Sequence, residues 1–380
     1  MIYLDNAATT KTAPEVVEAM IPYFTEHFGN AGSIYKLGSE SKKAIIQAKE
    51  TIAATLGAEP NEIYFTAGGT ESDNWAIKAA YEAYADKGKH IITSKIEHHA
   101  VLYTCEYLEK RGAEVTYLDV DENGLVDTEQ LKKAIRPDTI LISVMYANNE
   151  IGTIQPIREI GEIAAAHGIL FHTDAVQAYG QLPIDAADCH IDMLSASGHK
   201  FNGPKGIGFL YISKKAKIRS YVHGGQQERG RRAGTENVAG IVGIEAAVKR
   251  AYRVMDEKTK KEIELRDYLV KRIMREIPGT RLNGHPIERL PGNVNVSFES
   301  VEGESVLIML DMQGICASSG SACTSGSLDP SHVLLSIGLS PELARGSLRM
   351  TLSEDNTKEE MDIVVEEISR IVGRIRGMRI

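Results

Sequence analysis

The stretch SASGHKFNGPKGIGF, residues 195–209, decides the fold of this chain. It places Lys200 in a glycine- and proline-rich turn between apolar segments at 192–197 and 206–212, both of which predict strands. Such a turn fixes the backbone, so that the lysine amine projects from the edge of a sheet. In an open α/β sheet, ligands bind beyond the carboxyl ends of the strands. The stretch therefore predicts a functional lysine at a sheet edge; for Lys200 taken alone, an ordinary surface lysine is the alternative.

Short apolar segments alternate with helical patterns on both sides of this turn. The alternation predicts an α/β fold with a mainly parallel sheet covered by helices. Helical periodicity fits 70–87, 156–167 and a segment that begins at Ser41 as N-cap and stops at Gly57. Seven strands are expected, at 62–66, 90–94, 115–118, 140–145, 169–173, 192–197 and 206–212.

A long, charged helical stretch follows from about residue 240 and predicts a bridge to a second, smaller α+β domain. Strands at 293–298 and 347–352 and a charged C-terminal helix are expected there. We predict that 12–256 form a large cofactor-binding α/β domain. The small domain is predicted to comprise 1–11 and 257–380 and to carry the loop around Cys323.

The composition excludes several classes of protein. The 380 residues carry a net charge of −9 and are 43% hydrophobic, which argues against a nucleic-acid binder. No apolar run approaches the ~18 residues of a membrane span. The start MIYLDNAATT meets Asp5 and Asn6 before any apolar core, so no signal peptide is expected. The four cysteines lack CxxC spacing, so we predict a cytoplasmic protein with reduced thiols and no metal site.

A second candidate residue ends the strand candidate in ILFHTDAVQA, residues 169–178. Asp174 would lie at the same sheet edge as Lys200. A carboxylate at this place could pair with the protonated pyridine nitrogen of pyridoxal phosphate (PLP). A helix N-cap is an equally supported role for Asp174 alone, because TDAVQA also fits a helix start.

The turn in IYFTAGGTESDNWAI, residues 63–77, is a candidate phosphate cradle. A strand leads through Gly68 and Gly69 to Thr70 at a helix N-terminus, where backbone N–H groups and the helix dipole attract anions. The segment fits neither GxGxxG nor the Walker pattern. Glu71 and Asp73 in the first turn would repel a phosphate unless they point away.

Eight segments run nearly end to end along the chain: LDNAATT (4–10), GGTESDN (68–74), EHHAV (97–101), NNEIG (148–152), DAVQ (174–177), SGHKFNGPKG (197–206), RRAGTEN (231–237) and SSGSACTSGSLDPSHV (318–333). In this order they resemble the cysteine desulfurases of the NifS/IscS type. The resemblance implies a fold type I PLP-dependent transferase that takes sulfur from L-cysteine, releases alanine and leaves a persulfide on its own cysteine.

The resemblance implies roles at the cofactor. Lys200 is expected to form the Schiff base and Asp174 to hold the ring nitrogen. Asn149 and Gln177 are expected at the ring oxygen, and Thr235 at the phosphate of a neighbouring subunit, which implies a homodimer. The residues expected to hold the phosphate within the chain are Gly69, Thr70, Ser197 and His199.

The resemblance also implies roles toward the substrate. Arg349, with Asn149, is expected to bind the substrate carboxylate, a bidentate role suited to arginine. His98 is expected to transfer protons. Cys323 is expected to attack the substrate sulfur, and its small, polar neighbours predict a mobile loop between about 319 and 330.

Alternatives remain for several of these residues. Thr235 also fits an ordinary cap beside Glu236, Arg349 an ion pair with an acid on the next strand, and His99 competes with His98. Cys105 and Cys316 are expected to be packing residues. Cys189 neighbours His190, and a lone Cys–His pair is too little for a metal site.

Three rival functions remain open at this point. An aminotransferase needs no protein thiol, a selenocysteine lyase would prefer selenocysteine, and a non-catalytic assembly subunit would need neither Lys200 nor Cys323. For a desulfurase, the expected partner is a sulfur-acceptor protein, such as an iron–sulfur scaffold or a tRNA-thiolation protein.

Overall fold

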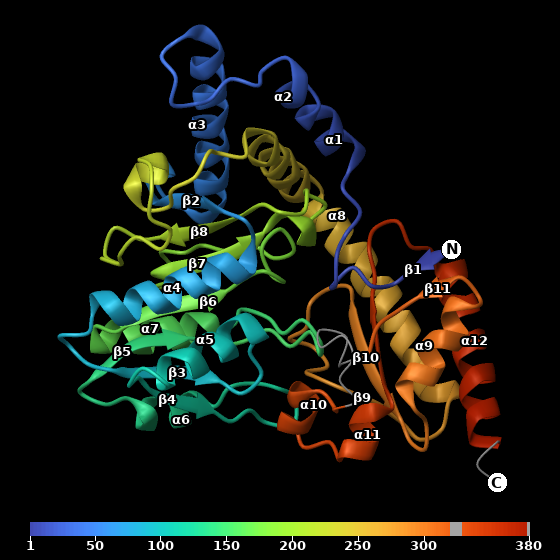
Figure 1. Ribbon diagram of the computed structural model, residues 1–380. Coiled ribbons are helices and arrows are strands. Elements are labelled where there is room, and N and C mark those ends of the chain that lie inside the picture. The colour runs from blue at the N-terminus through green and yellow to red at the C-terminus, as the bar shows by residue number, and fades with distance from the viewer. Residues whose placement is uncertain (320–328, 378–380) are drawn as a thin grey trace.

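A seven-stranded sheet forms the centre of the larger part of the molecule (Figure 1). The computed structural model describes residues 1–319 and 329–377. The strands lie in the order β2-β8-β7-β6-β5-β3-β4. Their bounds are β2 Ile63–Thr66, β3 His90–Ser94, β4 Glu114–Leu118, β5 Thr139–Ser143, β6 Leu170–Asp174, β7 Met193–Ser197 and β8 Gly208–Ile212.

The sheet is mainly parallel, as the sequence predicts. Strands β7, β6, β5, β3 and β4 pair in parallel, and β8 is antiparallel to both of its neighbours, β2 and β7. Each predicted strand range overlaps one of these strands. Because β6 and β7 are parallel neighbours, Asp174 lies opposite Ser195 in register, and the two strands end at the same sheet edge.

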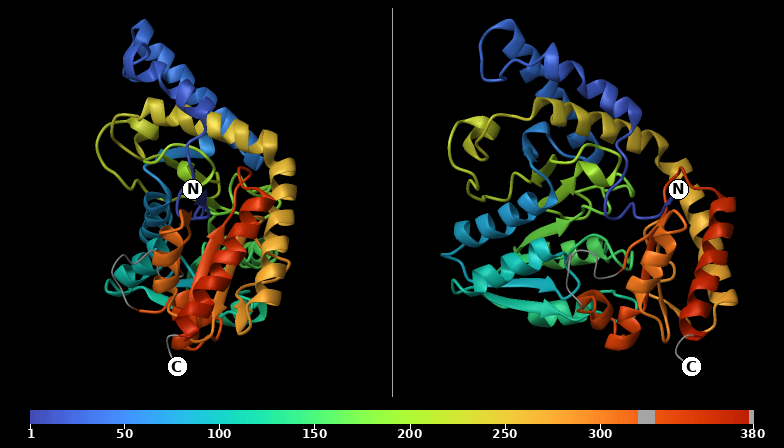
Figure 2. Two further views of the ribbon diagram at one scale, coloured as in Figure 1. Left: turned by 90° about the vertical axis from the view of Figure 1, so that its right-hand side faces the viewer. Right: turned by 45° about the vertical axis from the view of Figure 1, so that its right-hand side comes forward.

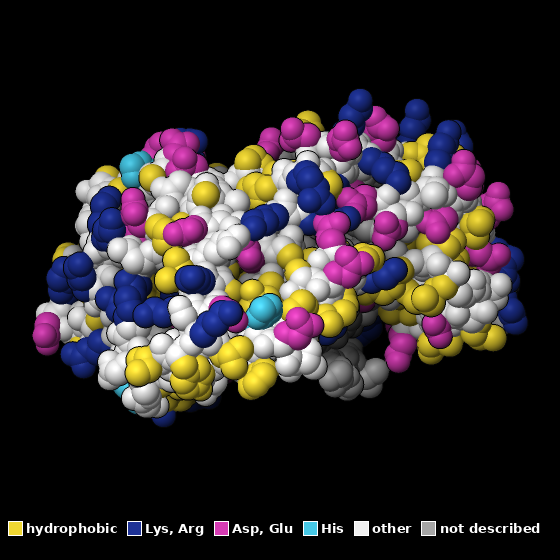
Figure 3. Space-filling model, turned by 90° about the horizontal axis from the view of Figure 1, so that it is seen from above, with side chains coloured by type: hydrophobic (Ala, Val, Ile, Leu, Met, Phe, Trp, Pro, Cys, Tyr) yellow, Lys and Arg dark blue, Asp and Glu magenta, His cyan; other side chains and the backbone are white. Residues whose placement is uncertain are grey.

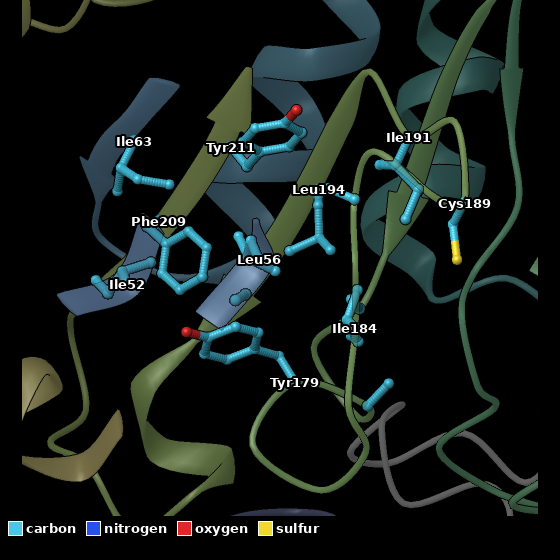
Figure 4. Packing of buried hydrophobic residues seen from close by; sticks show 14 of the residues in the cluster. Ile52, Leu56, Ile63, Tyr179, Ile184, Cys189, Ile191, Leu194, Phe209 and Tyr211 are labelled. Atoms are coloured by element: carbon cyan, nitrogen blue, oxygen red, sulfur yellow. The ribbon is translucent and has the colours of Figure 1, made fainter. Parts of the chain in front are cut away.

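Helices cover both faces of this sheet, so this part of the chain has three layers. Consecutive strand residues point to opposite faces: Leu210 packs toward α4 and α5, whereas Phe209 packs toward α3, α7 and α8. Figure 4 shows the second of these layers, with Leu56 of α3 beside Leu194 and Phe209 of the sheet. The covering helices are α3 Lys36–Leu56, α4 Gly69–Ala83, α5 His99–Glu109, α7 Ile157–His167 and α8 Val238–Glu276, with the shorter α1 Pro14–Met20, α2 Pro22–Thr25 and α6 Thr128–Ala134.

Helix α8 belongs to two hydrophobic cores. Its 39 residues correspond to a length of ~58 Å at 1.5 Å per residue. Ile244 and Val248 pack in the core of the large sheet, whereas Leu269 and Ile273 pack in a separate core. Figure 2 shows this helix running from the large sheet along the smaller part of the molecule. The predicted bridge is therefore one continuous helix.

The smaller part is built on the antiparallel sheet β12-β10-β9, with the parallel pair β1-β11 beside it. Residues Ile2 and Leu4 lie in its core, so the N-terminal segment packs here. The elements are β1 Ile2–Tyr3, β9 Thr280–Leu282, β10 Asn293–Phe298, β11 Ile315–Cys316 and β12 Ser347–Thr351, with α9 Gly303–Asp311, α10 His332–Ser336, α11 Pro341–Arg345 and α12 Lys358–Gly377.

Two helix boundaries differ from the prediction. Helix α3 begins at Lys36, without a side-chain cap, and Ser41 is buried inside it, where its hydroxyl donates to the His27 carbonyl at 3.3 Å. The prediction of Ser41 as N-cap was therefore wrong, because the helix starts five residues earlier and Ser41 lies inside it. Helix α4 ends at Ala83, and 84–87 form a turn rather than a last helical turn.

Within 1–319 and 329–377, the search for a helix that is long and apolar enough to span a bilayer found none. Lysine, arginine and acidic side chains are interspersed over the face seen in Figure 3, so that face carries no broad basic surface.

The second core depends on Leu269, whose side chain is fully buried. We expect Leu269→Ala to lower the free energy of unfolding by about 2–5 kcal/mol, because the truncation removes buried apolar area and leaves a cavity. Ile363→Ala on α12, where the isoleucine is 50% exposed, is the control, with an expected loss of less than about 1 kcal/mol. Urea unfolding followed by circular dichroism measures both losses, and equal losses would contradict the assignment of this core.

Candidate active site

One cavity of about 330 Å³ lies at the carboxyl ends of β6 and β7. It collects side chains from both parts of the chain, and Lys200 and Asp174 are among them. Its lining consists of Ala7, Ala8, Gly69, Thr70, Asp73, His98, Met145, Ala147, Asn149, Asp174, Val176, Gln177, Ser197, His199, Lys200 and Arg349. A cavity therefore lies at the sheet edge where the sequence predicts the functional residues, and Lys200 and Asp174 line it.

Lys200 ends a short 3₁₀ turn, Gly198–Lys200, that follows β7 directly. Its Nζ donates hydrogen bonds to the carbonyl oxygens of Ala7, at 2.5 Å, and of Ala8, at 2.9 Å. The ammonium group is therefore held by the N-terminal segment, which crosses this edge of the sheet, and Lys200 is not an isolated surface lysine.

Asp174 is the last residue of β6 and is 5% exposed. Its Oδ1 accepts a hydrogen bond from the Val176 backbone N–H at 2.9 Å. Burial raises the pKa of Asp174 to about 6, while the Val176 N–H and the Lys200 ammonium favour the carboxylate. Residues 175–180 contain a turn at 176–178 and no helix, so Asp174 is not a helix N-cap.

A second carboxyl group, Asp73 of α4, lines the same cavity and is 1% exposed. Burial and the charge of Asp174 hold the pKa of Asp73 well above its usual range. Its Oδ1 has no hydrogen-bond partner among the described residues and lies 3.6 Å from His172 Nε2. Two coupled, buried carboxyl groups resist double ionisation, so Asp73 retains the proton and Asp174 is the anion.

The strand–turn–helix from β2 to α4 is where the sequence predicts an anion site. Gly69 begins the helix, and a Cβ atom there would lie 2.5 Å from Val176 Cγ2, so the close approach of these two turns requires glycine. Thr70, Ser197 and His199 line the same hollow. The Glu71 carboxylate is drawn aside, since Arg232 Nε donates to it at 2.8 Å, and so it does not oppose a phosphate.

His98 lines the cavity and caps α5, its Nδ1 accepting the Ala100 backbone N–H at 3.1 Å. Because Nδ1 is an acceptor, the proton of the neutral ring lies on Nε2. Burial, with the charge of Lys200, lowers the pKa of His98 to about 4. His99 instead stacks on Tyr103, with 4.8 Å between ring centroids, so of these two histidines His98 is the one in the cavity.

Arg349 reaches the cavity from β12 of the smaller part and is 2% exposed. Its Nη1 donates to the Asn149 carbonyl at 3.1 Å, and its Nη2 lies 2.9 Å from Asp5 Oδ1. The expected alternative of an ion pair is therefore present, although its acid comes from the N-terminal segment. Arg349 Nε is buried and has no partner within the described parts of the chain.

Gln177 and Asn149 also line the cavity, and Gln177 Nε2 donates to the Ala7 carbonyl at 3.0 Å. Thr235 does not line it in the described structure; it is exposed and lines a separate depression with Arg232. Thr235 is also not the cap of α8, a role that Asn237 takes by accepting the Gly240 N–H.

Cys323 and most of the predicted mobile loop between 319 and 330 lie outside the described residues. Of the remaining cysteines, Cys105 and Cys189 are buried and Cys316 is half-buried, which fits the packing role expected for Cys105 and Cys316. Burial raises the pKa of the Cys105 thiol to about 12. No cluster of potential metal ligands was found in 1–319 and 329–377.

Sequence reasoning missed three contributions to the site. The Ala7 and Ala8 carbonyls, Asp5 and the proton on Asp73 carry no signature of their own. Asp5 and the alanines did lie in the quoted segment LDNAATT, and Asp73 lies one helical turn after Thr70, on the same face of α4. The position of Asp5 in LDNAATT and that of Asp73 one turn after Thr70 are therefore the sequence signals that could have placed these residues at the site.

The fold and the site agree with a known family. The sequence model of the family described as aminotransferase class-V matches residues 2–364. The chain belongs to this family.

Two relatives are named as cysteine desulfurases. The chain is 59% identical over 377 residues to the cysteine desulfurase IscS of Methanosarcina thermophila, covering 99% of this chain and 93% of that protein. It is 50% identical to the putative cysteine desulfurase IscS 1 of Bacillus subtilis, covering 98% of this chain and 99% of that protein. The resemblance to cysteine desulfurases of the NifS/IscS type is thereby confirmed.

Solved structures confirm the fold. A NifS-like protein superposes with a TM-score of 0.92 at 39% identity, covering 98% of this chain and 99% of that one. SspA in complex with cysteine superposes with a TM-score of 0.83 at 41% identity, covering 93% of this chain and 99% of that one.

The protonation of the two aspartates can be tested by substitution. We expect Asp73→Asn to leave the affinity of the apoprotein for PLP within about threefold, because a carboxamide imitates the neutral acid. Asp174→Asn should weaken PLP binding at least about tenfold, since it removes the anion expected to pair with the ring nitrogen. Absorbance titration of apoprotein with PLP measures both affinities. Equal losses in the two variants would show that Asp73 is ionised.

Buried acids also make stability depend on pH. Burial raises the pKa of Glu97 to about 8 and the pKa values of Glu150 and Glu262 to about 7. The folded chain therefore binds protons more tightly than the unfolded chain, and we expect the apoprotein to lose stability from about pH 7 to about pH 8.

Glu97→Gln should reduce this slope by roughly 1 kcal/mol per pH unit, because it removes one such group. Urea unfolding of apoprotein at the two pH values measures the slope. Glu18→Gln, at an exposed glutamate of α1, serves as control. An unchanged slope in Glu97→Gln would contradict the raised pKa of Glu97.

Proposed function

We propose that this chain is a PLP-dependent cysteine desulfurase, which takes the sulfur of L-cysteine, releases L-alanine and carries the sulfur as a persulfide on Cys323. The observation that carries the proposal is the convergence of Lys200, Asp174, His98 and Arg349 on one buried cavity. Transamination alone would require no cysteine, so Cys323 is the residue that selects desulfuration.

The cavity fits PLP. Asp174 is a buried anion suited to a pyridinium nitrogen, and Lys200 stands at the same sheet edge. Gly69 leaves the space that a Cβ would fill beside Val176, at the helix N-terminus where a phosphate would bind. The residues that would hold the group are Gly69, Thr70, Asn149, Asp174, Gln177, Ser197, His199 and Lys200, with Thr235 of a second subunit. When bound, PLP supplies an electron sink for the substrate α-carbon.

Proton transfer falls to Lys200 and His98. With PLP and substrate bound, the Lys200 amine would be the base that takes the α-proton of the substrate. His98 is neutral above about pH 4 and carries its proton on Nε2, so this N–H is available as a hydrogen-bond donor inside the cavity. Arg349, with Asn149 beside it, holds the substrate carboxylate, for which its unpartnered Nε–H is available.

Sulfur transfer falls to Cys323. Its thiolate attacks the substrate sulfur; an S–S bond forms and the carbon–sulfur bond breaks. The electron pair of the broken bond stays on the substrate carbon, which takes up a proton and leaves as L-alanine. Cys323 retains the sulfur as a persulfide, and an acceptor protein, such as an iron–sulfur scaffold or a tRNA-thiolation protein, removes it by thiol exchange.

A homodimer is the proposed assembly. Exposed apolar side chains are concentrated between residues 17 and 46 of α1 to α3, where Phe24, Phe28 and Ile34 are 64%, 65% and 102% exposed. An exposed apolar surface of this kind supports a protein partner. Thr235 is exposed and outside its own cavity, which supports a contact with the phosphate of a second subunit.

Two further proposals concern the chain as a whole. The separate cores on either side of α8 support a large domain at 12–256 and a small domain at 1–11 and 257–380. The unpaired thiols of Cys105, Cys189 and Cys316 support a reducing compartment such as the cytoplasm.

The test is production of alanine and sulfide from L-cysteine in the presence of a thiol reductant. We expect Cys323→Ala to lower sulfide release at least about a hundredfold, because none of the described cysteines, Cys105, Cys189 and Cys316, lines the cavity. The variant should still bind PLP and change its visible absorbance with cysteine. Cys316→Ala, at a half-buried cysteine, is the matched control and should retain activity.

Undiminished sulfide release from Cys323→Ala would overturn the role of this cysteine. Activity with selenocysteine but not with L-cysteine would indicate a selenocysteine lyase, and amino transfer to a keto acid would indicate an aminotransferase.

A further inference from the structure

The segment 4–10 touches both cations of the cavity. Ala7 and Ala8 accept hydrogen bonds from Lys200 Nζ through their carbonyls, at 2.5 and 2.9 Å, and Asp5 pairs with Arg349 at 2.9 Å. A span of four residues thus joins the proposed reacting lysine to the proposed carboxylate clamp.

This segment is fixed to β12 by several bonds. Asn6 Nδ2 donates to the Thr351 carbonyl at 2.7 Å, and the Ala7 N–H donates to Thr351 Oγ1 at 2.8 Å. The same strand carries Arg349. Asp5 is therefore held at a defined place relative to the arginine, and the contact does not depend on a flexible chain end.

The guanidinium of Arg349 is held at its two terminal nitrogens. Nη2 donates to Asp5, Nη1 donates to the Asn149 carbonyl, and Nε has no partner within the described residues. A guanidinium has five N–H donors, so these two bonds leave others for a ligand. An arginine that is 2% exposed also needs an anion nearby when no substrate is bound, because an unpaired buried charge is costly.

We infer that Asp5 is a positioning residue that sets the orientation of Arg349 and thereby the preference of the site for substrates with a free carboxylate. The inference rests on the proposed role of Arg349 and adds a residue to which no role at the site had been assigned. Asp5 fixes one edge of the guanidinium, so that the remaining N–H groups present a preset fork to a second carboxylate. Without Asp5 the guanidinium is no longer held in this orientation, so binding of the substrate must also order the arginine, which costs affinity.

The experiment compares two ligands that differ only at the carboxyl group, L-alanine and L-alaninamide. Their binding to the PLP-loaded protein is followed by the change in visible absorbance, which requires no sulfur chemistry. Wild type should prefer L-alanine. Asp5→Ala should reduce this preference by at least about tenfold, the worth of one charge-assisted hydrogen bond.

Two variants sharpen the test. Asp5→Asn keeps an oxygen that accepts from Arg349 Nη2, so its loss should lie between those of wild type and Asp5→Ala. Asp362→Asn removes a carboxylate that pairs with Arg272 elsewhere, at 2.5 Å, and should leave the preference unchanged. With L-cysteine, Asp5→Ala should raise KM while kcat stays within about threefold, as expected for a residue that acts on binding.

Each outcome decides one claim. An unchanged preference in Asp5→Ala would overturn the inference. Tighter L-alanine binding would also overturn it, because Asp5 would then only weaken the attraction of Arg349 for the carboxylate. A wild type that prefers L-alanine but releases no sulfide from L-cysteine would overturn the proposed function and leave the inference standing. A wild type without preference would overturn the role of Arg349 itself and, with it, the inference.

Discussion

The parallel pairing of β6 and β7 is the constraint on which the site depends. It brings the ends of two strands to one edge, so that Asp174 and the turn bearing Lys200 lie beside one cavity. The antiparallel strand β8 then leads the chain away from the turn and closes the sheet against β2. From β2 the chain enters α4, whose N-terminus is the proposed anion site. One arrangement of strands thus positions the lysine, the aspartate and the glycine turn.

Burial of charge shapes the rest of the cavity. Lys200 and Arg349 are paired with carbonyl oxygens and with Asp5, all from described residues. Of the two neighbouring aspartates, Asp73 takes the neutral state, which leaves Asp174 as the anion at the strand end. The lowered pKa of His98 keeps the ring neutral, with Nε2–H as a hydrogen-bond donor. The cavity therefore holds defined protonation states that follow from burial and from neighbouring charges rather than from the ordinary pKa values of the residues.

The parts of the fold and site that depend on local pattern were predictable from sequence. Asp174 ends a strand, Lys200 lies in the turn after one, and glycines mark the turn before Thr70, so their places follow from short-range signals. The Asp5–Arg349 contact joins residues 344 positions apart, and no local pattern encodes it. The proton on Asp73 depends on tertiary burial, which the helix pattern alone does not reveal. Helix α3 begins at Lys36 without a side-chain cap, so tertiary packing, not a capping residue, sets its start. Arg349 lies on β12 of the smaller part, far along the chain from the other cavity residues, so no local pattern predicts its role. Only the family resemblance implied it.

A PLP-type cavity and a cysteine in the segment 318–327 together imply that sulfur moves from the substrate to that cysteine. Mass spectrometry of the protein after incubation with L-cysteine that carries an isotopic label on sulfur tests this transfer. We predict labelled sulfur on the peptide that contains Cys323, removable by a thiol reductant and missing when Lys200 is replaced by alanine. Labelled sulfur only on Cys105, Cys189 or Cys316, or on no cysteine while labelled sulfide is still released, would contradict it.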